Sequence, residues 1–231
     1  MLIKNYKRIA DTKQKKDLLK IIDCAILHSI PDYVLKNSLK RIGNGIFVNG
    51  KKAADLKRNR IFVVGAGKAS GIMAGNFEKI IGVKNITAGK INYKGYRPKT
   101  KKIKTVLAGH PLPNKASIKG TREILDLKEK FKIGKDDVIF CLISGGGSAL
   151  MEHPISGITL QDMQKTTKAL LYCGANINEI NIVRQKLSQV KGGGLASHFH
   201  PARIYSLIIS DVIGNDLKTI ASGPTVNIKR A

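Results

Sequence analysis

The sequence predicts an α/β protein in which a parallel β-sheet is covered by helices on both faces. Short β-branched runs such as "RIFVVGAG" and "DDVIFCLIS" alternate along the chain with segments of helical spacing, and glycine-containing turns join them. The run "VIFCLI" is apolar at every position. This is typical of a strand that is buried on both faces, as in a doubly covered parallel sheet.

The first part of the chain has a different pattern. Residues 13–30 place apolar side chains at helical spacing, and a second short helix is expected over residues 32–41. The stretch "VNGKK" is typical of a turn between two short strands. We therefore expect residues 1–57 to form a helical and hairpin lead-in that packs on the core, and residues 58–231 to form the α/β domain.

The other elements follow from the same criteria. Further strands are expected in "NITAGKINY", "IKTVLAGH" and "ARIYSLIISDV". Helices are expected in "KASGIMAGNFEKIIG", "SIKGTREILDLKEKFKIG", "TLQDMQKTTKALLYCGA" and "NEINIVRQKLSQV". Gly134 is expected to close the second of these helices, and Thr159 to cap the third.

Composition favours a cytoplasmic protein. No apolar run approaches the ~18 residues that a membrane span needs, and the start "MLIKNYKRIADTKQKKDLLK" has no secretory hydrophobic region. The three cysteines, Cys24, Cys141 and Cys173, are far apart and form no C-x-x-C pair. Reduced thiols in the cytoplasm are therefore expected, with no membrane partner.

The chain is strongly basic, with 41 lysine and arginine residues against 16 acids and a net charge of +25. Such a charge attracts anions, among which nucleic acid and phosphorylated metabolites are the candidates. The densest stretch, "YKGYRPKTKKIK", carries no aromatic RNA-reading signature. We interpret it as a solvated basic face and disfavour nucleic acid as a partner.

The stretch "ISGGGSA" follows a predicted buried strand, where ligands of parallel α/β folds bind. Residues 145–147 are glycines, which let backbone N–H groups approach an anion closely. Ser144 and Ser148 add hydroxyl groups, and the N-terminus of the next helix adds positive potential. We interpret Ser144, Gly145, Gly146, Gly147 and Ser148 as a phosphate or carboxylate site; a tight packing turn is the alternative.

The stretch "VVGAGKASG" places Gly67 and Lys68 at another strand end. It is not a P-loop, because Ala69 follows the lysine. It is not a dinucleotide fingerprint either, because Ser70 stands where the third glycine belongs and no acid follows nearby. A lysine at a helix start favours an anion, and a packing turn is an equal alternative. The strand end in "LAGHPLPN" carries His110.

In "NEINIVRQKLSQVKGGGLA", Arg184, Ser188 and Lys191 are spaced i, i+4 and i+7, which predicts one shared helical face. A second glycine run with Gly192 and Gly193 follows. Arginine offers a planar fork for carboxylate or phosphate, so we expect Arg184, Lys191 and these glycines to bind an anionic substrate. Exposed salt bridges are the alternative.

Asp211 in "SDVIGND" follows the last predicted strand. A carboxylate there can bind Mg²⁺ or accept a proton from an alcohol. Asp216, in the same stretch, is interpreted as a helix cap.

Together the motifs "VVGAGKAS", "GHPLPN", "ISGGGSAL", "INIVRQKLSQVKGGGLA" and "LIISDVIGNDLKTIASGPT" resemble, in the same order, the class II glycerate 2-kinase family, whose members are often labelled hydroxypyruvate reductase. The resemblance runs from about residue 61 to residue 225. It implies a Rossmann-like domain that transfers the γ-phosphoryl of ATP to the 2-hydroxyl of glycerate with Mg²⁺. It also implies catalytic roles for Lys68 and Asp211.

The sequence departs from the family pattern by stopping at Ala231, a few residues after "SGPT". The family's smaller C-terminal domain is therefore expected to be absent, or to be a separate polypeptide. Asn215 stands where many relatives carry aspartate. Two alternatives stay open: an NAD(P)H-linked hydroxypyruvate reductase, with Lys84 and Arg97 available for a 2′-phosphate, and a non-catalytic anion-binding remnant. The chain is also a candidate for forming a homodimer.

Overall fold

The computed structural model describes residues 2–226 and contains a five-stranded sheet in the order β6-β5-β4-β7-β8. Every neighbouring pair of these strands is parallel, as predicted. The strands are β4 (Ile61–Gly67), β5 (Ala88–Tyr93), β6 (Ile103–Leu107), β7 (Val138–Ser144) and β8 (Arg203–Ile209). Positions 227–231 of the expected α/β domain lie outside the described residues.

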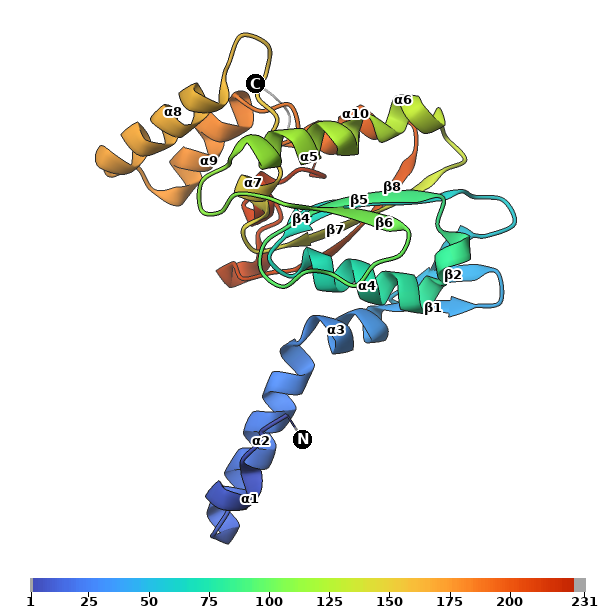
Figure 1. The fold of residues 1–231 in the computed structure, drawn as a ribbon, viewed down its shortest axis with the longest axis vertical. Helices are drawn as coiled ribbons and strands as arrows, with labels where there is room; N and C mark the ends of the chain where they lie inside the picture. Colours follow the sequence, from blue (N-terminus) through green and yellow to red (C-terminus); the bar gives the residue numbers. More distant parts are fainter. Residues whose placement is uncertain (1, 227–231) are drawn as a thin grey trace.

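Helices cover both faces of the sheet, which confirms the predicted fold class (Figure 1). One face carries α4 (Ser70–Ile81), and the other carries α5 (Lys115–Leu125), α6 (Leu127–Phe131) and α10 (Gly194–Phe199). Between β7 and α10 the chain forms α7 (Gly147–Leu150), α8 (Leu160–Tyr172) and α9 (Ile177–Lys186). The short 3-10 helices are η1 (Val83–Asn85), η2 (Ile213–Asn215) and η3 (Ile220–Ser222).

The core consists of two apolar clusters, one on each face of the sheet. Strands β4 and β7 are buried at every position, as their uninterrupted apolar sequences predict. On the α4 face, the rings of Phe77 and Phe140 pack with their centroids 5.0 Å apart. On the other face, Phe62, Ile143 and Phe199 are buried.

The N-terminal region consists of α1 (Tyr6–Ile9), α2 (Lys13–Ser29), α3 (Pro31–Ser38) and an antiparallel sheet of β1 (Leu39–Ile42), β2 (Gly45–Val48) and β3 (Lys51–Asp55). Leu35, Leu39 and Ile46 are buried in the α4-side cluster. Helix α2 has no buried residue and projects away from the sheet (Figure 1). The expected helix over residues 32–41 ends earlier, because Leu39 pairs with Val48 in a strand.

Two other helices end where the sequence pattern did not predict. The helix expected up to Gly134 divides at Asp126, and Lys132 ends its second part in a left-handed conformation with φ of 47°. The helix expected through Val190 ends at Lys186. Ser188 forms a bridge with Pro154 instead, so the prediction that Arg184, Ser188 and Lys191 share one helical face is wrong. Within residues 2–226, no helix is long and apolar enough to cross a membrane.

Candidate functional site

The loops that follow β4 and β7 are bonded to each other at the carboxyl edge of the sheet. The amide of Lys68 donates to the carbonyl of Gly145 at 2.9 Å. The hydroxyl of Ser144 accepts from the amide of Ala69 at 2.9 Å and lies 3.3 Å from the hydroxyl of Ser70. The two glycine motifs, far apart in sequence, therefore form one double loop.

Gly67 and Ser144 belong to the interior of this double loop. A Cβ atom on Gly67 would lie 2.1 Å from Oγ of Ser144, and the φ of Gly67 is 154°. Ser144 is only 2% exposed. The structure thus places both residues in the contact that joins the loops, and we assign them to loop geometry rather than to direct contact with a ligand.

Three side chains from different loops converge on Gly145 and Gly146. A Cβ atom on Gly145 would lie 2.0 Å from Oδ2 of Asp211. A Cβ atom on Gly146 would lie 2.9 Å from Nε2 of His110 and 3.2 Å from Cε of Lys68. Side chains at these positions would displace the three groups, which explains why the turn consists of glycines. We call these five residues the glycine rim.

The backbone of the glycine turn also allows a ligand to approach its amide groups closely. Gly146 has a φ of +80°, in the left-handed region that glycine adopts without strain. Among residues 2–226, its amide has no backbone acceptor. Gly147 is buried, and a Cβ there would lie 2.8 Å from Cβ of Ala221. The following helix α7 has only four residues, so the expected helix-terminal potential is small.

The protonation of His110 depends on its burial and on the charges beside it. Partial burial lowers the pKa of His110 below its ordinary value of 6.5, and the positive charges of Lys68 and Lys94 lower it further, whereas Asp211 opposes them. The imidazole is therefore neutral at pH 7. Sequence reasoning marked this strand end but did not include His110 among the binding residues; its position directly after a strand was the available signal.

Arg184 and Lys191 contact the protein interior. Lys191 is 1% exposed; its ammonium donates to the carbonyls of Ser148 at 2.8 Å and Met151 at 3.1 Å and pairs with Glu152 at 2.8 Å. Arg184 donates to the carbonyl of Ser148 at 3.1 Å and lies 3.6 Å from Glu152. Burial lowers the pKa of Lys191 to about 8, against the opposing charge of Glu152. These two cations hold the segment after the glycine turn in place. Their partner Glu152 could not be predicted, because a single acid outside any motif does not stand out in the sequence.

The second glycine run is bonded to the end of the described chain. The amides of Gly192 and Gly193 donate to the carbonyls of Ser222 at 2.9 Å and Gly223 at 2.7 Å. The hydroxyl of Ser148 lies 2.7 Å from that of Ser222. Of the residues expected to bind substrate, the structure therefore brings Lys68, Gly145, Gly146 and Asp211 together and gives Arg184, Lys191, Gly192 and Gly193 internal contacts.

A metal would have few protein ligands at this rim. Within the described part of the chain, no group of three or more histidine, cysteine, aspartate or glutamate side chains is arranged to hold an ion. Asp216 accepts from the amide of Lys218 at 3.1 Å and the hydroxyl of Thr219 at 2.6 Å. Its carboxylate therefore has partners within a local turn. The N-cap of the next 3-10 helix is Thr219, so the expectation that Asp216 caps a helix start is wrong. Asp211 is the carboxylate that faces the glycine turn.

The fold places this chain in the class of α/β proteins with a parallel sheet covered by helices, and the glycine rim lies at the carboxyl edge of that sheet. A family model described as "Domain of unknown function (DUF4147)" matches residues 17–230, and the chain belongs to this family. Among curated proteins, it is 42% identical over 208 residues to the glycerate 2-kinase of Pyrococcus horikoshii, covering 90% of this chain and 46% of that protein. It is 37% identical to the D-glycerate 2-kinase of Thermotoga maritima, covering 91% of this chain and 47% of that protein.

A similar protein of Agrobacterium vitis, 42% identical over 167 residues, carries the provisional name hydroxypyruvate reductase; the match covers 72% of this chain and 43% of that protein. Solved structures agree with the fold. A Pyrococcus horikoshii protein superposes with a TM-score of 0.86 at 40% identity, over 94% of this chain and 48% of that chain. The glycerate kinase of Thermotoga maritima superposes with a TM-score of 0.77 at 36% identity, and the match covers 90% of this chain and 47% of that chain. The chain spans about half the length of the curated relatives it matches.

Proposed function

We propose that this chain supplies the N-terminal, Rossmann-like half of an ATP-dependent glycerate 2-kinase. The reaction converts D-glycerate and ATP to 2-phosphoglycerate and ADP. The observation that carries the proposal is the convergence of Lys68, His110 and Asp211 on one glycine turn. That turn occurs in a chain 42% identical to a glycerate 2-kinase over 90% of its length.

Phosphoryl transfer requires positioning and charge neutralisation more than covalent chemistry by the protein. Lys68 is exposed and its side chain passes beside Gly146, so its ammonium can neutralise the transferred phosphoryl group. The amide of Gly146 adds a donor for a phosphoryl oxygen. In this proposal the other expected site residues act indirectly, by holding the loops that present these groups. They are Gly67, Ser144, Ser148, Arg184, Lys191, Gly192 and Gly193.

Asp211 is proposed as the base for the acceptor alcohol. Its carboxylate accepts the proton of the 2-hydroxyl of glycerate as that oxygen bonds to the γ-phosphorus, while the bond from phosphorus to the leaving ADP oxygen breaks. His110 is neutral at pH 7 because its pKa is lowered. It can therefore hold a hydroxyl or carboxylate oxygen in place by a hydrogen bond without adding a further charge beside Lys68.

Magnesium fits the same proposal through Asp211. Mg²⁺ is usually held by one or two carboxylates and completes its shell with water and substrate phosphates, so a single carboxylate at the rim suffices. Bound there, the ion would neutralise phosphate charge. The second half of the relatives' length is proposed to close over both substrates, from the same or a separate polypeptide. A cytoplasmic location and a homodimer belong to the same proposal.

An assay of ADP release tests the function. The chain is incubated with ATP, Mg²⁺ and D-glycerate, alone and together with a polypeptide carrying the C-terminal half encoded beside it or that of the Pyrococcus horikoshii relative. We expect ADP release that requires D-glycerate and is lost in Lys68→Met but kept in Lys165→Gln, an exposed lysine on α8. Failure of every complemented sample overturns the proposal.

The same samples separate the two alternatives. A reductase would oxidise NADPH or NADH in the presence of hydroxypyruvate, which a loss of nicotinamide absorbance would reveal. The residues at the end of β5, Asn92 and Tyr93, and the following Lys94 include no acid for a ribose, which favours the kinase. A non-catalytic remnant would bind ATP by calorimetry without turnover in any complemented sample.

A further inference from the structure

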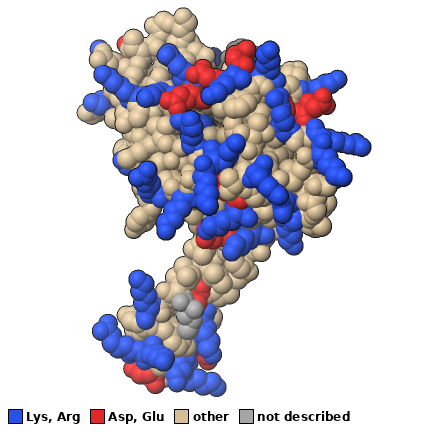
Figure 2. Space-filling view, turned by 45° about the vertical axis from the view of Figure 1, so that its right-hand side comes forward, with Lys and Arg blue, Asp and Glu red and all other residues tan. Residues whose placement is uncertain are grey.

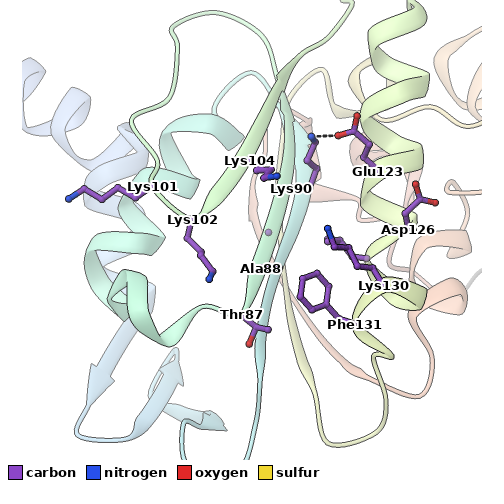
Figure 3. Close-up of a pocket in the computed structure, with 12 residues that line it drawn as sticks. Thr87, Ala88, Lys90, Lys101, Lys102, Lys104, Glu123, Asp126, Lys130 and Phe131 are labelled. Carbon is purple, nitrogen blue, oxygen red and sulfur yellow. Dashed lines mark hydrogen bonds and ion pairs between the residues drawn. The ribbon is translucent and has the colours of Figure 1, made fainter.

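A cavity of about 570 Å³ opens between the edge of the sheet and helices α5 and α6 (Figure 3). Residues 87–90 at the start of β5 and residues 102 and 104 at the start of β6 line its sheet side. The helices contribute Glu123, Asp126, Lys130 and Phe131. The glycine rim follows the carboxyl ends of strands, so this cavity lies at the opposite end of the sheet and is a separate site.

The sheet face inside the cavity carries lysines where apolar side chains are expected. Lys90 and Lys104 are register partners on neighbouring parallel strands, so they share one face of the sheet. The next register partner of Lys90 is Val64, a buried core residue on that same face. Lys90 is only 9% exposed. Glu123 pairs with Lys90, so within the described chain the charge left without a partner on this face is that of Lys104, and an anion in the cavity would offset it.

The backbone that carries these lysines is held firmly in place. Glu78 is buried, and its carboxylate accepts from the amides of Lys101, Lys102 and Ile103, each at 2.7 Å. Hydrogen bonds to a carboxylate are among the stronger ones in proteins. Lys102 points toward the cavity in Figure 3, whereas Lys101 points away. The backbone at this side of the cavity is thus held in place before any ligand binds.

Positive charge exceeds negative charge within the cavity. Lys90 pairs with Glu123. In the described range 2–226, Lys102, Lys104 and Lys130 have no carboxylate within 4.0 Å. Figure 2 shows lysine and arginine side chains over much of the visible face. The cavity differs from the rest of that basic surface because its lysines line a hollow. The hollow is half open, and its concave shape suits a compact anion better than a flat surface would.

We propose that this cavity binds a small phosphorylated metabolite that carries at least two phosphate charges. The ammonium group of lysine is a compact cation with three donors, and several lysines together bind the multiple oxygens of phosphate groups as point charges. The described lining contains lysines and no arginine. Leu127 and Phe131 supply an apolar wall for the carbon part of the ligand. The volume falls within the ~300–1,000 Å³ typical of small-molecule sites.

Calorimetry with sodium tripolyphosphate as the probe, at about 0.1 M salt, tests the proposal. The double variant Lys102→Gln/Lys104→Gln removes two exposed lysines of the cavity. We expect it to weaken binding about tenfold or more, the loss expected for removal of two charge-assisted contacts. The matched control Lys165→Gln/Lys168→Gln removes the same charge from exposed positions on α8 and should change the affinity by about twofold or less, since remote charges are screened.

The variant Lys68→Met separates this site from the glycine rim. Tripolyphosphate binding that persists in Lys68→Met and falls in Lys102→Gln/Lys104→Gln supports the cavity, whatever the outcome of the kinase assay. Three results overturn it: no binding by the unmodified chain, equal losses in the two double variants, or a loss confined to Lys68→Met. A single-stranded oligonucleotide that binds more tightly than tripolyphosphate, and weakens equally in both double variants, would also overturn it.

Discussion

The carboxylate of Asp211 packs directly against the backbone of Gly145, so closely that a Cβ on the glycine would lie 2.0 Å from Oδ2. Asp211 follows β8, and Gly145 follows β7. These two strands are parallel neighbours in the sheet. Their pairing therefore fixes where the proposed base stands relative to the glycine turn.

Gly145→Ala is expected to lower kcat/KM of the complemented enzyme about 10- to 100-fold, because a displacement near 1 Å can cost that much. The methyl group must push the carboxylate of Asp211 away, since it would otherwise lie 2.0 Å from an oxygen. Steady-state kinetics with D-glycerate measure the effect. Gly134→Ala is the control, because a Cβ there meets no atom within 4 Å. Equal activities of the two variants would contradict the role of the contact.

The pKa of His110 should shift in opposite directions when the two charges beside it are removed. Lys68→Met removes a neighbouring positive charge and should raise the pKa, whereas Asp211→Asn removes a negative charge and should lower it further. An NMR titration of the histidine ring protons measures both shifts. Shifts of the same sign in the two variants would show that His110 does not lie between these charges.

The same lowered pKa predicts a pH dependence of stability. The folded state binds the proton of His110 more weakly than the unfolded state, whose pKa is near 6.5. The contribution of His110 to the free energy of unfolding is therefore fully present above that value and is lost as the pH falls through the folded-state pKa. Urea unfolding at pH 7.5 and 5.5, with His110→Gln for comparison, measures it. The variant should lose less stability on acidification; an unchanged loss would contradict the prediction.

Glu152→Gln is expected to lower the free energy of unfolding by about 3–5 kcal/mol, the usual cost of breaking a buried ion pair. Glu152 is fully buried between Lys191 and Arg184, so its removal leaves two cations without their counter-charge. Urea denaturation measures the loss. Glu129→Gln, at an exposed position on α6, is the matched control and should stay within about 0.5 kcal/mol. A loss below about 1 kcal/mol in Glu152→Gln would contradict the pairing.

Two of the three thiols should react quickly with Ellman's reagent in the native protein. Cys24 and Cys173 are exposed, whereas Cys141 is buried in β7. Burial also raises the pKa of Cys141 to about 12, which leaves almost no thiolate to react. A timed absorbance measurement, followed by denaturation, should show the third thiol only after unfolding. Rapid reaction of all three would contradict the burial of β7.

The sequence predicted the sheet well because its signal is local. Strands such as β7 are buried on both faces, so their residues are apolar at every position and stand out without knowledge of any partner. Lys68 could be singled out for a similar reason, because it directly follows the fully buried strand β4, and Asp211 because it lies just after β8, which the sequence also marked as a strand. The structure then brought them to the same glycine turn.

The remaining residues could not be placed from local patterns. The spacing of Arg184 and Lys191 suggested a continued helix with outward cations, but the helix ends at Lys186 and both side chains turn toward Glu152. That acid lies more than thirty positions earlier in the chain, and helical periodicity carries no information about such a partner. The amides of Gly192 and Gly193 were expected to face an anion, but they donate to carbonyls of residues 222–223. Those acceptors are also distant in the sequence and leave no local pattern.

The glycine rim draws its five members from the segments that follow four different strands: Lys68 after β4, His110 after β6, Gly145 and Gly146 after β7, and Asp211 after β8. No short peptide excised from the chain holds more than one of these loops. Contacts between such distant segments form late, because the entropy of closing long loops must be overcome first. Recovery of ligand affinity should accordingly lag behind the return of helical signal when the protein is refolded from urea.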